Sequence, residues 1–558
     1  MNQWSLKRLE ISDLPNQPEL PPLIGRLLAL RGLIDPSQIN DFLNPEYNKL
    51  HDPFLFKQMQ DAVVRIKQAI ERNEKITIYA DYDADAITAA AVVFLALQKL
   101  GLAADYYIPD RFSEGYGMNV EAVKKIAAKG AQLIITVDCG TNAVAEAKLC
   151  QELGIDLIIT DHHEITGELP KALALVNPKN PADNYPFEYL TGVGVAFKLV
   201  QALFAKTGTG FEKWLLDLVA IGTVADCQSL TFENRILVSF GLKVLEKTRW
   251  VGLRALMQTA AISGKLDTFT LGFLIAPRIN AAGRIKHGNT AFELLVSQDK
   301  GRASELAKEL NQLNQHRQTL TEQIMSEARA QIQMLTDKKV LLTYGADWPK
   351  GIVGLVAGKL AEEYHRPVLA VSTTAEGLAV GSARSVASFN IVAALNHAKQ
   401  HLEKFGGHTQ AAGFTLDSKQ LQDFHLKLLE YADFVNFALA EPIMEADVQI
   451  EPADINWELM GYLEKFAPFG IGNPRPKFLG LGLQVLEFKT VGNSNKHLKM
   501  RVKFGLHEFS AIAFGQAYLS NQLQINQVID AIFELNTNEW NGNKQLELKI
   551  LDLKTKDA

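Results

Sequence analysis

Cysteine is scarce in this sequence of 558 residues, which contains only Cys139, Cys150 and Cys227. Their scattered positions argue against a disulfide framework or a zinc knuckle and favour the reducing cytosol. Also absent is an uncharged apolar run of the roughly 18 residues that a membrane span needs. The first residues, MNQWSLKRLEI, lack the apolar core of a signal peptide. We therefore expect a soluble, cytoplasmic protein that does not act at a membrane.

The sequence also has no excess of basic residues, because 57 Lys and Arg face 63 Asp and Glu, a net charge of −6. Any affinity for nucleic acid must therefore come from local basic patches and from bound metals. What is present is a globular composition, with 47% hydrophobic and 22% charged residues, which supports a folded core. At this length we expect two to four domains.

Three carboxylates at alternate positions, Asp81, Asp83 and Asp85, follow a short β-branched run at 76–78. Alternate residues on extended chain point the same way, so these side chains can converge at the carboxyl end of a strand. Converging negative charges repel one another unless a cation lies between them. The stretch therefore predicts a site for a hard divalent metal such as Mg²⁺ or Mn²⁺. The alternative is a solvated acidic turn that caps a helix.

The pattern from residue 58 to 176 is an alternation of strands and helices, which predicts a parallel, doubly wound sheet. Strands are expected at 76–80, 104–108, 133–137, 156–160 and 173–176, and helices at 58–73, 87–100, 119–129 and 142–153. Such sheets bind ligands beyond the carboxyl ends of their strands. Two further strands end there in Asp138 and in Asp161-His162-His163. Taken singly, Asp138 is open to interpretation as a helix cap, and the histidine pair as a surface loop.

An apolar helix expected at 211–223 leads to Asp226. A carboxylate beside such a segment needs a partner, either a metal or a cation such as Arg235. The segment Gly272 to Arg284 then carries Arg278, Asn280 and Arg284 among small residues. It suits close approach of a phosphate, or a loop that forms salt bridges with acidic neighbours.

A long helix at 301–335 is predicted to connect two domains across a cleft. A second α/β unit follows, with strands at 339–343 and 368–372 and a helix at 353–364. The Gly-rich segments 381–385 and 405–414 can present backbone N–H groups to phosphate, or they are ordinary turns.

Short alternating strands at 497–503, 509–514, 528–535 and 545–553 predict a small barrel, plausibly of the OB type. Basic residues gather on it at Lys496, Lys499, Arg501 and Lys503, with Phe504 and Phe509 nearby. This combination suits single-stranded nucleic acid, through backbone charge and base stacking. The alternative is an exposed charged face of a strand.

The motifs together resemble the DHH phosphoesterase superfamily and, within it, the RecJ exonucleases. They are ADYDADAITAAAV, ITVDCGTN, DHHE, LVAIGTVAD, GFLIAPRINAAGRI, GSARS, FGGHTQAAGF and PFGIGNPRPKF, in family order from about residue 60 onward. The resemblance implies an α/β fold, with a DHH parallel-sheet domain joined by a long helix to a smaller α/β DHHA1 domain and a C-terminal OB-like β-barrel. The expected divisions are 1–57 (N-terminal bracing segment), 58–300 (DHH), 301–335 (connecting helix), 336–440 (DHHA1) and 441–558 (OB-like).

The activity that the resemblance implies is exonuclease degradation of single-stranded DNA in the 5′→3′ direction to 5′-mononucleotides, in DNA repair and recombination. Two divalent cations, Mn²⁺ or Mg²⁺, would be the cofactors. Single-stranded DNA is the expected partner of a monomer, with a helicase and a single-strand-binding protein as further candidates. The alternatives are a phosphodiesterase of the DHH superfamily acting on short oligonucleotides, cyclic dinucleotides or pyrophosphate, and a non-catalytic replication scaffold.

The resemblance also carries site residues onto this sequence. It implies that one metal is held by Asp85, Asp138, His162 and Asp226. It implies that the other is held by Asp83 and Asp138, with Asp81 as a ligand or an orienting group. By the same resemblance, His163 would face the scissile phosphate. The substrate-binding residues that it implies are Arg111, Arg278, Ser382 and Arg384 in a 5′-phosphate pocket, Tyr116 stacked on a base, and Asn280 and His408 on phosphate.

The sequence departs from the family pattern at two positions. Ala86 stands where a glycine commonly follows the third Asp, and Phe405 replaces the first glycine of a Gly-Gly-Gly-His motif. Ala86 is tolerated if its backbone is helical and strained if it needs a positive φ. Because every ligand position is intact, we expect an active enzyme.

Overall fold

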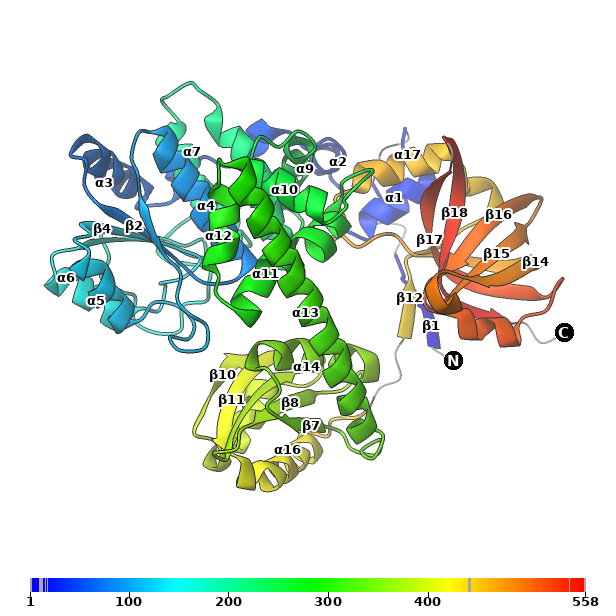
Figure 1. The fold of residues 1–558 in the computed structure, drawn as a ribbon. Helices are drawn as coiled ribbons and strands as arrows, with labels where there is room; N and C mark the ends of the chain where they lie inside the picture. The colour runs from blue at the N-terminus through cyan, green and yellow to red at the C-terminus, as the bar shows by residue number, and fades with distance from the viewer. Residues whose placement is uncertain are drawn as a thin grey trace.

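The structure, a computed structural model of the chain, describes residues 3–9, 14, 15, 17, 19–439, 443–540 and 542–555. Figure 1 shows three bodies: an α/β lobe in blue to green, a smaller α/β lobe in yellow-green below it, and an orange-red barrel. The expected boundary between the last two domains, at 440/441, lies outside the described residues. Among the described residues, no helix is both long and apolar enough to cross a membrane.

The first lobe is built on a five-stranded parallel sheet in the order β3-β2-β4-β5-β6. All residues of β2 and β4 are buried, as expected for strands covered on both faces. Helices α3, α4 and α7 contribute to the core on one face, and α5 and α6 to the core on the other. The bounds are β2 Ile76–Ala80, β3 Asp105–Tyr107, β4 Leu133–Val137, β5 Asp156–Thr160, β6 Ala174–Val176, α3 Met59–Glu71, α4 Ala84–Lys99, α5 Val120–Ala128, α6 Val144–Glu152 and α7 Gly192–Phe204.

A helical half completes this lobe and joins it to the second. Its elements are η4 Phe211–Leu215, α8 Leu216–Ala225, α9 Phe232–Leu245, α10 Val251–Thr259, η5 Thr270–Ile275, α11 Ala276–Ile285 and α12 Asn289–Val296. The connecting helix α13 spans Lys300–Ile332 and begins where the Asp299 side chain accepts from the Arg302 amide. It packs on α10 and α11 at one end and on α14 and β7 at the other, so it bridges the two lobes (Figure 1).

The second lobe has a mixed sheet in the order β10-β11-β9-β8-β7, in which only β7 and β8 are parallel. Its elements are β7 Leu341–Ala346, α14 Lys350–Tyr364, β8 Val368–Thr373, β9 Leu378–Arg384, α15 Ile391–His397, η6 Lys399–His401, β10 Lys404–His408, β11 Ala411–Asp417, η7 Ser418–Gln420 and α16 Leu421–Phe434. Both Gly-rich segments lie on strands of this sheet.

The C-terminal barrel closes because β14 pairs with both β15 and β17. Its elements are β12 Ile443–Ala446, β13 Val448–Gln449, η8 Pro452–Asp454, α17 Trp457–Phe466, β14 Phe478–Val491, η9 Asn493–Asn495, β15 His497–Phe504, β16 His507–Ala513, η10 Ala517–Gln522, β17 Val528–Trp540 and β18 Asn543–Thr555. The N-terminal segment contributes β1 Gln3–Leu6, α1 Pro22–Ala29, α2 Pro36–Leu43, η2 Tyr47–Lys49 and η3 Pro53–Leu55. Strand β1 pairs with β12, and α1 packs in the core of the barrel.

Three local expectations are wrong. Asp85 does not lie on extended chain, because α4 begins at Ala84. Residues 276–285 form helix α11 rather than a loop. The segment 211–223 is a 3₁₀ turn followed by α8, rather than one helix.

Candidate metal centre and phosphate cluster

The three carboxylates after β2 converge through a strand-to-helix turn. Asp81 ends the strand, and its Oδ1 accepts from the Tyr82 amide at 2.7 Å. Asp83 caps α4, with Oδ1 accepting from the Ala86 amide at 3.0 Å. Asp85 lies in the first turn of the helix. Ala86 is also helical and buried, so its replacement of the usual glycine introduces no left-handed strain.

Asp85 is fixed by the N-terminus of a second helix. Its Oδ2 accepts from the Gly192 amide at 2.7 Å, and its Oδ1 accepts from the Val193 amide at 2.9 Å. Both amides belong to the first turn of α7, where unpaired N–H groups favour an anion. The carboxylate is therefore held in one orientation, with 2% of the residue exposed.

Four side chains from four elements meet at one point, with His162 in contact with three carboxylates. Its Nε2 lies 3.0 Å from Asp138 Oδ1, 3.8 Å from Asp226 Oδ2 and 3.9 Å from Asp85 Oδ2. These residues come from the ends of β4 and β5, the end of α8 and the first turn of α4. The structure therefore brings together the four residues that the resemblance assigned to one metal. His163 Nδ1 lies 3.9 Å from Asp138 Oδ1 on the neighbouring side.

The non-metal interpretations of Asp138 and Asp226 are wrong, whereas Asp83 does cap a helix. Asp138 caps no helix: it is buried with φ of 58°, and the capping position of α6 belongs to Ala143. Asp226 does not pair with Arg235, whose guanidinium donates instead to the backbone carbonyls of Phe42, Lys465 and Phe466.

The donor set fits a divalent cation. Buried Asp81 Oδ2, Asp138 Oδ1, Asp226 Oδ2 and His162 Nδ1 make no hydrogen bond with any described residue. Leaving such atoms unpaired is costly, and a cation would satisfy the carboxylate oxygens. The mixture of carboxylate oxygen and imidazole nitrogen suits Mn²⁺ and also accepts Mg²⁺.

Two glycines leave room for this cluster. A Cβ on Gly192 would lie 2.3 Å from Asp138 Oδ1. A Cβ on Gly222 would lie 2.3 Å from Thr88 Oγ1 and 2.8 Å from Asp85 Oδ1. Both positions are helical, so the requirement for glycine comes from the close approach of the carboxylates rather than from the backbone angle.

Burial and mutual repulsion raise the pKa of the carboxyls. For Asp81, burial and then Asp83 raise the pKa to about 7. For Asp226, the same two causes also raise the pKa to about 7. Burial raises the pKa of Asp85 and Asp138 well above the ordinary value. Burial and then His163 lower the pKa of His162 to about 3, so its imidazole is neutral and free to bind a metal.

His163 is oriented by Asp161, the first residue of the DHH motif. Its Nδ1 lies 2.7 Å from Asp161 Oδ1, and the same oxygen accepts from the His162 amide at 2.7 Å. Burial lowers the pKa of His163, but the bond to Asp161 and the nearby carboxylates outweigh it, and the net pKa is raised. The other ring nitrogen, Nε2, lies 2.7 Å from the Tyr116 hydroxyl.

Arginines converge beside the metal centre. Arg284 lies near the positive charges of Arg111, Arg317 and Arg384. Burial is the main cause that lowers the pKa of Arg284 to about 10, and the repulsion from these three arginines lowers it further. Arg384 donates to Ser382 Oγ at 2.8 Å, and the Arg111 guanidinium lies 4.8 Å from the centre of the Tyr82 ring. Such a group of cations is typical of a phosphate site.

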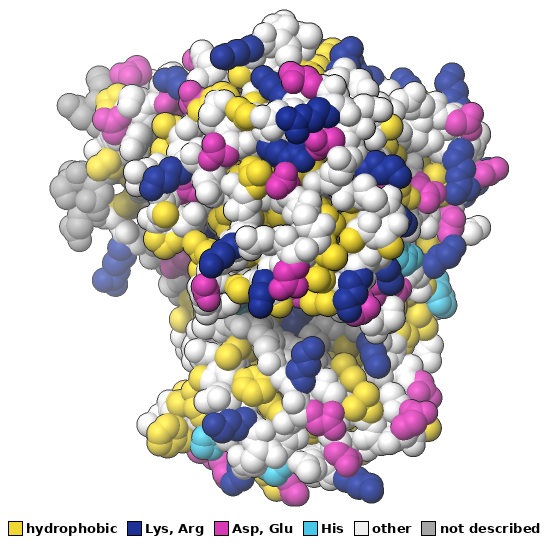
Figure 2. Space-filling view, turned by 90° about the vertical axis from the view of Figure 1, so that its left-hand side faces the viewer, with side chains coloured by type: hydrophobic (Ala, Val, Ile, Leu, Met, Phe, Trp, Pro, Cys, Tyr) yellow, Lys and Arg dark blue, Asp and Glu magenta, His cyan; other side chains and the backbone are white. Residues whose placement is uncertain are grey.

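The cluster spans the two lobes. Arg284 on α11 donates to the Gly351 carbonyl on α14 at 3.2 Å, and a Cβ on Gly351 would lie 2.4 Å from the Arg284 carbonyl. Figure 2 shows the groove between the upper and lower lobes, with Lys and Arg side chains along both edges.

The remaining expected substrate residues have other partners or none. Arg278 donates to Asn311 Oδ1 on α13 at 3.0 Å and to the Leu274 carbonyl at 2.6 Å. Asn280 Oδ1 accepts from the Ala84 amide at 2.9 Å, so it supports the start of α4. His408 is exposed at the end of β10, and Tyr116 is 58% exposed above the metal centre.

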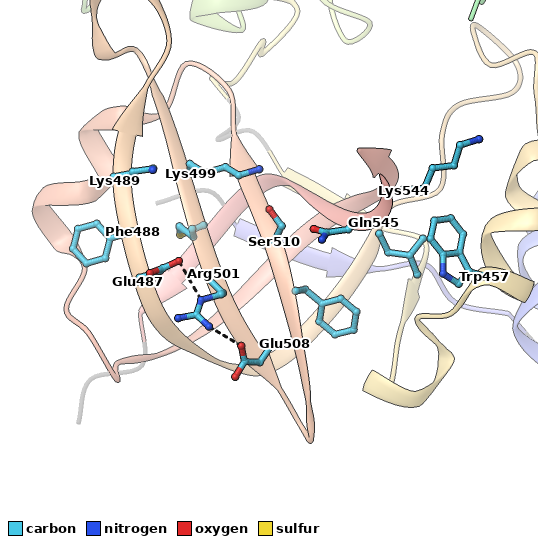
Figure 3. A pocket seen from close by; sticks show the side chains of 13 residues that line it. Trp457, Glu487, Phe488, Lys489, Lys499, Arg501, Glu508, Ser510, Lys544 and Gln545 are labelled. Atoms are coloured by element: carbon cyan, nitrogen blue, oxygen red, sulfur yellow. Dashed lines mark hydrogen bonds and ion pairs between the residues drawn. The ribbon is translucent and has the colours of Figure 1, made fainter. Parts of the chain in front are cut away.

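The barrel has a groove of about 730 Å³ on β14, β15, β16 and β18, shown in Figure 3. Lys489, Lys499, Arg501 and Lys544 line it, but Arg501 lies between Glu487 and Glu508, and Lys499 pairs with Glu547. The expected stacking role of Phe504 is wrong, because alternation along the strand buries its ring in the barrel core. Phe509 is mostly buried but lines the groove together with Phe488 and Trp457, so its stacking role stays a prediction.

Sequence reasoning missed two residues of this region. Asp161 was noted as part of the DHH motif but given no role, although a carboxylate beside a histidine commonly sets its tautomer. Arg284 was noted in its segment, but Arg278 was chosen for the phosphate pocket. The two arginines are six residues apart, about 120° around a helix, so they leave α11 on different sides: Arg284 lies among Arg111, Arg317 and Arg384, and Arg278 lies near Arg317.

Three family models match the chain: the DHH family N-terminal domain over residues 75–223, the DHHA1 domain over residues 337–432 and the RecJ OB domain over residues 446–552. The single-stranded-DNA-specific exonuclease RecJ of Bacillus subtilis is 39% identical over 559 residues, which cover 99% of this chain and 70% of that protein.

Two crystal structures of RecJ from Thermus thermophilus share the whole architecture. The complex with Mn²⁺ has a TM-score of 0.85 at 29% identity, covering 100% of this chain and 80% of that one. The complex with Mg²⁺ has a TM-score of 0.79 at 28% identity, covering 100% and 79%. The expected fold class, two α/β lobes and an OB-like barrel, is confirmed. The chain belongs to the RecJ family of DHH proteins.

Proposed function

We propose that this protein is a metal-dependent exonuclease that degrades single-stranded DNA in the 5′→3′ direction to 5′-mononucleotides, in DNA repair and recombination. The observation that carries the proposal is the meeting of Asp85, Asp138, Asp226 and His162, where Asp138 Oδ1 and Asp226 Oδ2 are buried without a hydrogen bond to any described residue. Its relatives carry the name of single-stranded-DNA-specific exonucleases, and a solved relative binds Mn²⁺.

In this proposal Asp85, Asp138, His162 and Asp226 hold one divalent cation, Mn²⁺ or Mg²⁺. Asp83 and Asp138 hold the second, and Asp81 either binds it or orients its neighbours. When bound, two such cations lower the pKa of a water molecule and stabilise charge on phosphate oxygens. The amides of α7 keep Asp85 oriented for this role, and Gly192 and Gly222 leave space for the carboxylates.

His163 acts on the phosphate by hydrogen bonding. Asp161 fixes its Nδ1, which leaves Nε2 directed away from the metal ligands and towards Tyr116. Because its pKa is raised, this imidazole is a good donor to a phosphate oxygen or to the leaving 3′-oxygen. Tyr116 holds the position until substrate replaces it, and its exposed ring then stacks on a base.

The arginine cluster sets the direction of degradation by binding the 5′ end of the strand. Arg111, Arg284, Ser382 and Arg384 bind the 5′-phosphate, since guanidinium groups match phosphate in two-point contacts. Arg278 and Asn280 support α13 and α4, and His408 reaches phosphate from the second lobe.

The proposed domains keep the expected boundaries at residues 57, 300, 335 and 440. The helicase, the single-strand-binding protein and the monomeric state stay predictions.

The test is product analysis on single strands labelled at the 5′ or the 3′ end, with Mn²⁺ and with Mg²⁺. The expected result is early release of the 5′ label as a mononucleotide, abolished by EDTA. Release of the 3′ label first would overturn the polarity, and hydrolysis that persists in EDTA would overturn the metal requirement.

A further inference from the structure

Two phenylalanines on one helical turn are exposed to solvent as a stacked pair. The rings of Phe269 and Phe273 lie 4.8 Å apart at 19°. Phe269 is 57% exposed and Phe273 is 67% exposed, at the start and within η5. Exposing two large rings side by side is unfavourable in water, so such a pair indicates a binding surface for a ligand or a partner.

The pair lines a hollow of about 420 Å³ whose wall includes residues next to Asp226 in the sequence. Ala225 and Cys227, the neighbours of Asp226 in sequence, lie in its wall. Asn280, whose side chain supports Ala84 at the start of α4, lies there too. One end of the hollow is therefore beside the proposed site of hydrolysis.

The other end leads to the barrel. Phe469, Arg475 and Glu534 line both this hollow and a second one of about 260 Å³, which Asn536 and Thr537 of β17 continue. The second hollow and the barrel groove of Figure 3 both border helix α17. In addition, Thr537 pairs with Leu546, which lines the barrel groove.

Aromatic faces dominate the middle of this track, and a cation lies beside them. The Arg475 guanidinium is 4.6 Å from the centre of the Phe469 ring and 3.6 Å from Asp267 Oδ2, and Arg475 and Phe469 line the same hollow as Phe269 and Phe273. Apolar planar surfaces next to a guanidinium are complementary to unpaired bases on a phosphate backbone.

We propose that Phe269 and Phe273 form a base-stacking subsite for the part of the single strand that lies between the metal centre and the barrel. This inference rests on the proposed function and deepens it, because the subsite selects single strands. Every base has a face on which a ring can stack, so the subsite tolerates all sequences. Bases in a duplex are already stacked on their neighbours and cannot present these faces without unpairing.

The test compares a long oligo(dT) with a 5′-phosphorylated trinucleotide, which has only two bases beyond the one at its 5′ end. For the Phe269→Leu/Phe273→Leu double variant, we expect the ratio of the KM for the long strand to the KM for the trinucleotide to rise about tenfold per lost ring. Trp at both positions should restore the ratio. Phe434→Leu, which alters a ring 77% exposed on the second lobe, is the control and should change nothing.

The outcomes separate the two proposals. If wild-type protein hydrolyses neither substrate, the proposed nuclease function is wrong. If hydrolysis is normal but the Leu double variant keeps the wild-type ratio, the stacking subsite is wrong. A Phe273→Trp variant gives a direct reading: oligo(dT) in EDTA should quench its emission. If the fluorescence emission of this variant does not change with oligo(dT) but shifts with protein concentration, the surface is one for self-association instead.

Discussion

Binding of Mn²⁺ should release protons from the metal centre, because the folded, metal-free protein holds its carboxyls partly protonated. The pKa values of Asp81 and Asp226 are raised to about 7. One pH unit below its pKa, a carboxyl is about nine-tenths protonated. At pH 6 these two groups therefore carry about two protons, and Asp85 and Asp138, whose pKa values are also raised, add to that number.

A metal takes deprotonated ligands, so its affinity should fall as the pH falls. With two protons displaced, we expect the dissociation constant to rise about a hundredfold for each pH unit below 7. At pH 8 the same two groups are about nine-tenths ionised, so their share of the release should be small. His162 does not contribute, because its pKa is lowered to about 3 and its imidazole is already neutral.

Isothermal titration with Mn²⁺, in buffers of different ionisation enthalpy, counts the protons at each pH. Asp217→Asn is the control: Asp217 is fully buried, and burial raises its pKa to about 6, but it bonds Thr248 and Trp250 outside the metal centre. The variant should keep the proton count. A Mn²⁺ affinity that is independent of pH between 6 and 8 would refute the account of a repelling, protonated cluster.

Four further outcomes are expected. Asp138→Asn should abolish nuclease activity while raising the unfolding temperature of the metal-free protein, because it removes a carboxyl whose ionised form is disfavoured by burial and by neighbouring carboxylates; an unchanged rate would contradict its role. Gly192→Ala, whose Cβ would meet Asp138, should cost about 1–3 kcal/mol in urea unfolding and weaken Mn²⁺ binding, whereas Gly461→Ala, with open space around it, should do neither. Arg284→Gln should reduce the preference for 5′-phosphorylated over 5′-hydroxyl strands by about 10- to 100-fold, measured as a ratio of kcat/KM; an equal loss on both would deny it a phosphate contact. The raised pKa of Asp217 favours its protonated form, so the contribution of this group to stability should fall by about 3 kcal/mol as the pH rises from 4 through 6; in denaturant titrations, the difference in unfolding free energy between wild type and Asp217→Asn should change by that amount.

The meeting of Asp138 and His162 could be predicted from the sequence because a parallel sheet puts the ends of its strands at one edge. Asp138 and His162 follow strands whose buried runs are plain in the sequence, and the edge is where a ligand binds. The route by which Asp85 joins them could not be predicted. It depends on where α4 begins, and helix ends are set by capping contacts such as Asp83 to the Ala86 amide.

The phosphate cluster was less accessible to sequence reasoning because it depends on helical phase and on packing between lobes. Arg278 and Arg284 look equivalent in the sequence, and only the rotation of α11 decides which of them faces Arg384. On the barrel, the burial of Phe504 could have been predicted from the sequence. Lys503 and Phe504 are adjacent on a strand, so their side chains lie on opposite faces, and an exposed Lys503 requires a buried Phe504.

The charge pattern along the proposed substrate path changes with the task of each part. The metal centre is a concentration of buried carboxylates, so a phosphate can come close only when cations neutralise them. The arginine cluster beside it has the opposite sign and holds the chain end. Further along, Phe269 and Phe273 are uncharged, and Arg501 on the barrel is already paired with carboxylates. In the proposed path a strand would be held firmly at its 5′ end and by base stacking elsewhere, an arrangement that would let the remainder slide forward after each nucleotide is removed.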